Sequence, residues 1–84
     1  MRHNVLIVDD EQLIRQGLRA RIEYLGIDVD EIFEADNGLM ALGIQDEHPI
    51  DLVITDIRMP DMDGLELIQE MQKKNNQIKF IVLS

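Results

Sequence analysis

The chain has 84 residues, no cysteine and a formal net charge of -9 at pH 7. A chain of this length forms at most one domain, and because it lacks cysteine it has neither disulfides nor thiolate metal sites. Its acidity argues against direct binding of nucleic acid or anionic membranes by this segment. The sequence shows neither a signal peptide nor an apolar stretch that could span a bilayer, so we expect a cytoplasmic protein.

The first predicted element is a strand over residues 5–8, an unbroken run of Val, Leu and Ile that is typical of a parallel strand buried on both faces. Two acids, Asp9 and Asp10, follow it directly. Residues 11–25 predict an amphipathic helix that ends near Gly26. Its apolar side is expected to consist of Leu13, Ile14, Leu18, Ile22 and Leu25.

The middle of the chain predicts a second strand and a second helix. Residues 27–35 are the least regular segment, although the alternation within residues 31–35 fits a short strand covered on one face. A turn follows, and we expect Asp36 or Asn37 to cap the next helix, which ends before Pro49.

The last part of the chain predicts a third strand, a third helix and a fourth strand. The third strand covers residues 51–55 and is followed by Asp56, and residues 59–64 form a loop. The fourth strand covers residues 78–83. The apolar stripe of the third helix is expected to comprise Leu65, Ile68 and Met71.

Strands and helices thus alternate as β-α-β-α-β-α-β, which predicts an α/β fold with parallel strands and right-handed crossovers. Ligands bind such sheets at the carboxyl ends of the strands, so Asp9, Asp10 and Asp56 should converge on one pocket. Three converging carboxylates indicate a site for a divalent cation. Taken singly, the two adjacent acids also fit a helix cap and Asp56 also fits a turn residue.

Three blocks of sequence identify a family. The segments VLIVDDE (residues 5–11), DLVITDIRMP (residues 51–60) and MDG (residues 62–64) resemble the receiver domain of two-component response regulators. The resemblance covers essentially the whole chain and implies a flavodoxin-like, doubly wound parallel sheet of strand order 2-1-3-4-5. Strands one to four fall within residues 1–84, so we expect an incomplete receiver domain in which the fifth strand and the last helices are missing.

The resemblance also implies roles for individual residues. Asp56 matches the phosphoacceptor, and Asp10 matches a direct ligand of Mg²⁺. Asp9 would bind the same ion through water, and the backbone carbonyl of Arg58 would be a further ligand. Ser84 matches a hydroxyl residue that contacts the phosphoryl group, although a terminal serine is commonly just solvated.

A receiver domain is expected to work with a sensor histidine kinase and to regulate an attached output domain, without being an enzyme itself. The segments around residues 13–18 and 54–60 are most similar to regulators with a DNA-binding output of the AraC type, so DNA would be contacted only through a domain absent from this chain. We also expect the edge of the fourth strand to favour self-association, unless the chain is a fragment of a longer polypeptide.

Three other functional classes fit the sequence less well. A module that interacts with partners without being phosphorylated would normally lack some of the acids, and all three are present. A Mg²⁺-dependent phosphohydrolase of the haloacid dehalogenase type would carry Asp-x-Asp after the first strand, where this chain has Glu11 two residues after Asp9. A nucleotide- or flavin-binding module would need a glycine-rich or hydroxyl-rich loop there, which makes it the weakest alternative.

Overall fold

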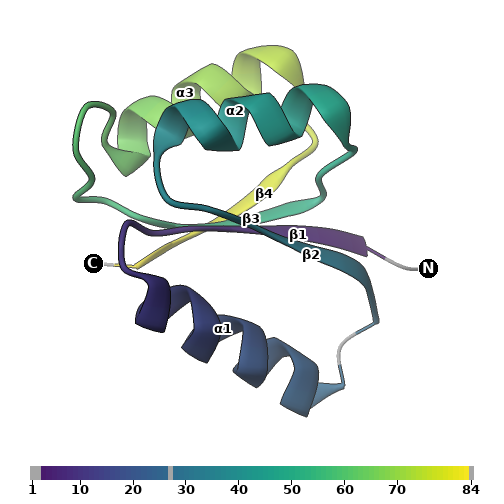
Figure 1. Cartoon of the computed structure of the whole chain (residues 1–84). Coiled ribbons are helices and arrows are strands. Elements are labelled where there is room, and N and C mark those ends of the chain that lie inside the picture. The colour runs from purple at the N-terminus through teal and green to yellow at the C-terminus, as the bar shows by residue number, and fades with distance from the viewer. Residues whose placement is uncertain (1–2, 27, 84) are drawn as a thin grey trace.

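The structure is a computed structural model that describes residues 3–26 and 28–83. Within these residues, strands and helices alternate in the predicted order (Figure 1). The elements are β1 (His3–Val8), α1 (Gln12–Leu25), β2 (Val29–Ala35), α2 (Gly38–Glu47), β3 (Leu52–Asp56), α3 (Gly64–Lys74) and β4 (Lys79–Leu83). None of these helices has the length and apolar character needed to cross a bilayer.

The described strands form one parallel sheet of order β2-β1-β3-β4, which confirms the predicted flavodoxin-like arrangement. Helices α2 and α3 cover one face of this sheet, and α1 covers the other (Figure 1). The two central strands lie in register up to the pair Val8 and Thr55. The carboxyl ends of β1 and β3 therefore lie next to each other.

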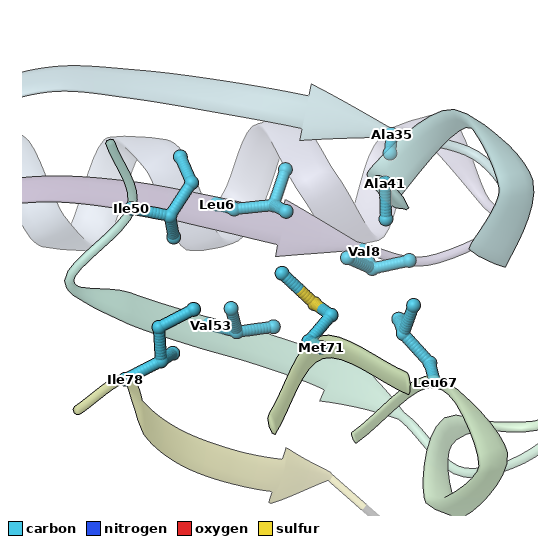
Figure 2. Close-up of a cluster of buried hydrophobic side chains, with 9 residues drawn as sticks. All are labelled: Leu6, Val8, Ala35, Ala41, Ile50, Val53, Leu67, Met71 and Ile78. Atoms are coloured by element: carbon cyan, nitrogen blue, oxygen red, sulfur yellow. The ribbon is translucent and has the colours of Figure 1, made fainter. Parts of the chain in front are cut away.

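Both faces of the central strands are buried, as the unbroken apolar run predicted. Leu6 and Val8 point towards α2 and α3, where Figure 2 shows them with Ala41 of α2 and with Leu67 and Met71 of α3. Val5 and Ile7 point to the opposite face and pack with Ile22 of α1 and Ile54 of β3. A period of two residues with helices on both sides explains why residues 5–8 of β1 form an unbroken apolar run.

Helix α1 is less buried than its sequence predicted. Ile22 is its one buried residue in the described chain, whereas Leu13, Ile14 and Leu25 are 81%, 43% and 68% exposed. A single helix on a sheet face buries only a narrow stripe, and Leu13 and Leu25 fall outside it. Gly26 ends the helix in a left-handed conformation, with φ of 68°, as predicted.

The other two helices begin at side-chain caps. Of the two residues expected to cap α2, Asn37 is the one that does so, because its side chain accepts the Met40 N–H. Asp63 caps α3 and forms a reciprocal capping box with Glu66.

The predicted stripe of α3 was wrong at one position. Leu65 is 55% exposed, and Leu67 is the fully buried residue that packs in the core together with Met71. The helix begins with Gly64 against the backbone of β3, and this contact sets which face of α3 meets the sheet. The buried positions are consequently 64, 67 and 71.

Strand boundaries differ slightly from the predictions. β2 begins at Val29, earlier than the alternating segment suggested, and β3 extends to include Asp56. β4 lies at one end of the sheet in the described residues, and its Ile81 and Val82 are 48% and 38% exposed. Self-association through this edge stays a prediction.

Candidate metal centre

Asp9, Asp10 and Asp56 meet at the carboxyl edge of the sheet, as the sequence predicted. Asp9 and Asp10 directly follow β1, and Asp56 is the last residue of the neighbouring strand β3. One carboxylate oxygen from each of the three residues lies within 4.8 Å of the other two. The capping interpretation of the adjacent acids is wrong for α1, because Glu11 occupies the N-cap position.

Asp9 is the buried member of this acidic cluster, with 3% of its surface exposed. Its Oδ1 accepts the Glu11 N–H at 2.9 Å. Burial raises the pKa of Asp9, the Glu11 N–H opposes this, and the nearby charges of Asp56 and Asp10 raise the pKa further. The carboxylate is therefore held in place by the backbone but is destabilised as an anion by its surroundings.

Asp56 is half-buried, and local backbone contacts hold it. Its Oδ1 accepts the Arg58 N–H at 3.4 Å, and its backbone carbonyl accepts the Thr55 hydroxyl at 2.9 Å. Gly64 lies against the same residue, because a Cβ at position 64 would be 2.2 Å from the Asp56 carbonyl oxygen. The Gly64 N–H also donates to the Ile57 carbonyl at 2.8 Å. The loop after Asp56 thus folds back tightly onto the end of β3.

Asp9 and Asp56 line an open pocket of about 220 Å³, which Glu11, Ile14 and Leu83 complete. A larger pocket of about 540 Å³ lies between α1 and β2. We place the candidate site in the smaller pocket, because the larger one is lined by none of the three acids.

The acidic cluster has the composition of a site for a hard divalent cation. No ion pair within residues 3–26 and 28–83 involves Asp9, Asp10 or Asp56. Oxygens that share one Mg²⁺ at ~2.1 Å lie about 3–4 Å apart, so small side-chain rotations would bring these oxygens to bonding distance. The residues present therefore fit a magnesium ion.

For two further predicted site residues, Arg58 and Ser84, the predicted roles stay predictions. Arg58 contributes its N–H to Asp56, and the role of its carbonyl as a metal ligand stays a prediction. Ser84 lies outside the described residues. Its neighbour Leu83 is paired with Asp56 across β3 and β4, and its carbonyl accepts the Ile57 N–H at 3.4 Å.

Sequence reasoning missed a basic side chain at this site. Arg15 of α1 donates from Nη1 to the backbone carbonyl of Asp9 at 2.6 Å and from Nε to Glu34 of β2 at 3.1 Å. Arg19, one helical turn later, donates to the other carboxylate oxygen of Glu34 at 2.7 Å. Residues four positions apart lie on the same face of a helix, so the spacing of Arg15 and Arg19 in the sequence indicates that they could share an acidic partner.

A family model described as the response regulator receiver domain matches residues 5–84. A probable transcriptional regulator, ycf27, from Cyanidium caldarium is 44% identical over 98% of this chain and 31% of its own length. The chemotaxis protein CheY from Bacillus subtilis is 37% identical over the whole of this chain and 68% of its own length. The chain spans about a third of the length of several of the curated relatives that it matches.

The fold also matches solved structures. The crystal structure of a two component transcriptional regulator AraC from Clostridium phytofermentans superposes with a TM-score of 0.90 and is 41% identical. The match covers 95% of this chain and 64% of that one. The likeness therefore extends to sequence as well as to the arrangement of strands and helices.

Proposed function

The chain belongs to the family of response regulator receiver domains, and on this premise we propose that it accepts a phosphoryl group on Asp56 in a Mg²⁺-dependent reaction. The donor would be a phosphohistidine of a sensor histidine kinase. The meeting of three carboxylates at two neighbouring strand ends supports this function most directly. Asp56 suits the role of acceptor because it is the member of the cluster that ends β3 and lines the open pocket.

The proposed step is a transfer between two nucleophiles. A carboxylate oxygen of Asp56 attacks phosphorus, a P–O bond forms and the P–N bond to the donor imidazole breaks. The electron pair of that bond stays on the imidazole nitrogen, which takes a proton from solvent. The product on the receiver is an acyl phosphate, and the step needs no oxidant or further co-reactant.

The chain's own residues would hold the acceptor and the ion. The Arg58 N–H and the tight packing of Gly64 orient Asp56 before the reaction. Asp10 would be a direct ligand of Mg²⁺, Asp9 a ligand through water and the Arg58 carbonyl a further ligand. When bound, Mg²⁺ supplies positive charge that offsets the repulsion between the carboxylates and an anionic phosphoryl group. Ser84 would contact the phosphoryl group after transfer.

The wider role is proposed from the relatives. Several are named as transcriptional regulators, and the chain covers only part of their length. We propose that phosphorylation regulates an attached output domain, which would be the part that contacts DNA. The receiver itself would turn over no substrate, and it would act in the cytoplasm beside its kinase.

Phosphorylation of the full-length protein by acetyl phosphate or a phosphorylated histidine kinase tests this function. With Mg²⁺ present, intact-mass measurement should detect one added phosphoryl group that hydroxylamine removes. Asp56→Asn should reduce the labelling to background, because an amide is a poor nucleophile. Asp61→Asn is the matched control, since Asp61 has φ of 71° and asparagine also adopts this conformation.

Each alternative function gives a different outcome. A pure interaction module would show no added phosphoryl group in the wild-type protein. A phosphohydrolase would release phosphate with repeated turnover. Undiminished labelling of the Asp56→Asn protein would move the acceptor to another residue and refute the assignment.

A further inference from the structure

Arg15 connects three parts of the chain at the edge of the acidic cluster. Its side chain is 15% exposed and leaves α1 to reach both the backbone after β1 and the Glu34 side chain of β2. The 2.6 Å bond to the Asp9 carbonyl is a charge-assisted hydrogen bond, and it joins residues six positions apart. Because the Arg15 side chain is mostly buried and bonded to both of these partners, its guanidinium has little freedom to move.

The carbonyl that Arg15 holds belongs to the peptide unit between the two adjacent acids. A peptide unit is planar, so fixing the direction of its C=O restricts ψ of Asp9 and φ of Asp10 together. These two torsions set how the Asp9 and Asp10 carboxylates are oriented relative to each other. Because the Asp10 side chain is exposed, few neighbouring side chains restrain it, and the orientation of its carboxylate depends strongly on this backbone restraint.

The opposite side of Asp9 is tied to β2. The Asp9 N–H donates to the Ala35 carbonyl at 3.1 Å, and Glu34, the preceding residue of that strand, holds Arg15. The Glu34 carboxylate bonds Arg15 through one oxygen and Arg19 through the other. Both peptide groups of Asp9 are thus anchored to the end of one strand, one directly and one through Arg15.

We propose that Arg15 is a positioning residue for the metal site: by bonding the Asp9 carbonyl it sets the mutual orientation of Asp9 and Asp10 for binding a divalent cation. This inference rests on the proposed function, because it assigns Asp10 and Asp9 to the ion. Glu34 orients Arg15 through the second bond. The lowered pKa of Glu34, caused mainly by its bond to Arg19 and also by that to Arg15, agrees with a carboxylate that stays charged and keeps this hold.

Arg19 offers a matched control for this role. Arg15→Gln and Arg19→Gln each remove one positive charge and one ion pair with Glu34, but only Arg15 bonds the Asp9 carbonyl. Loss of a residue that orients a metal ligand typically weakens metal binding about 10–100-fold. We expect Arg15→Gln to weaken Mg²⁺ binding about 10-fold and Arg19→Gln to weaken it less than about 3-fold.

The measurement is a Mg²⁺ titration of the full chain, followed by the ¹H–¹⁵N NMR signals of residues around the cluster. The hydrogen exchange rate of the Glu11 N–H is measured separately on its own NMR signal, in the absence of metal, because this N–H bonds the Asp9 carboxylate. Arg15→Gln should accelerate this exchange at least about 5-fold more than Arg19→Gln does, because a freed Asp9 would hold the amide less well.

The outcomes separate the possible failures. Equal Mg²⁺ affinities and equal Glu11 exchange in the two variants would refute the positioning role and leave Arg15 a purely structural residue. Wild-type protein that binds no Mg²⁺ would refute the proposed function, and the exchange rates alone would then decide whether Arg15 positions Asp9. If Arg15→Gln fails to fold, Arg15→Lys replaces it: a lysine keeps the charge but lacks the planar fork for both bonds, so the same loss is expected.

Discussion

At the scale of single residues, Asp9 and Gly64 determine the character and the shape of the acidic cluster. Asp9 places a carboxylate where burial raises its pKa, so its presence is unfavourable for the metal-free fold. Gly64 has no side chain at the place where the backbone of α3 packs directly against the backbone of Asp56 and Ile57. The first feature suits the proposed binding of a cation, and the second allows the loop after Asp56 to pack against the end of β3.

Replacing Gly64 with alanine should strongly destabilise the protein. The added Cβ would lie 2.2 Å from the Asp56 carbonyl oxygen, so β3 or α3 must shift. We expect a loss of about 3 kcal/mol or more in the free energy of unfolding, measured by urea denaturation. Gly17→Ala is the control: its Cβ meets nothing within 4 Å, and helix propensity should raise stability by about 0.5–1 kcal/mol. Equal effects of the two changes would contradict this account.

At the scale of elements, α1 depends on polar contacts as well as apolar ones. Few of its apolar residues are buried, and Arg15 and Arg19 attach it to β2 through Glu34. Each arginine also donates to a backbone carbonyl, Arg15 to Asp9 and Arg19 to Ile32. The helix that follows the two adjacent acids is thereby fixed to the strand beside them.

The attachment of α1 should depend on pH. The two arginines lower the pKa of Glu34 below its usual 4.5, so its stabilising effect is present above about pH 4.5 and is lost as the pH falls through the lowered pKa. Glu34→Gln should therefore cost about 1 kcal/mol of unfolding free energy at pH 7 and progressively less as the pH falls below about 4.5.

Urea denaturation across this pH range tests the prediction. Glu70→Gln is the control, because Glu70 pairs with the exposed Lys73 one turn away and should contribute only about 0.3–0.5 kcal/mol. A Glu34→Gln effect that does not change with pH would argue that the carboxylate acts by shape rather than by charge.

At the scale of the whole molecule, the proposed ion binding would link the acidic cluster to the stability of the fold. The folded state holds three acids close together, whereas the unfolded chain lets them separate. A cation that binds only the folded state stabilises it by mass action. Mg²⁺ should therefore raise the melting temperature of the wild-type protein.

Neutralising Asp9 should raise stability without metal and reduce the effect of Mg²⁺. Because the pKa of Asp9 is raised in the fold, its anion is unfavourable above that pKa, and the penalty disappears as the pH falls through it. Asp9→Asn keeps an oxygen for the Glu11 N–H and removes the charge. We expect a higher melting temperature in EDTA and a smaller increase with Mg²⁺.

Asp46→Asn serves as the control for this change. Asp46 is an exposed acid paired with Lys74, away from the cluster, so its replacement should not raise the melting temperature and should leave the Mg²⁺ effect intact. A lower melting temperature of Asp9→Asn in EDTA would contradict the assigned repulsion.

The sequence by itself determined the order of elements, the two-sided burial of the central strands and the meeting of Asp9, Asp10 and Asp56. These features depend on local periodicity and on the rule that parallel strands end at the same edge of a sheet. Only the tertiary structure decided that Leu67 rather than Leu65 is buried, that Leu13 and Leu25 are exposed, and that Arg15 reaches the Asp9 carbonyl. Each of these features depends on how a helix is rotated and placed against the sheet. That placement is set by contacts between different elements of the fold, such as Gly64 with Asp56 and Arg15 with Glu34.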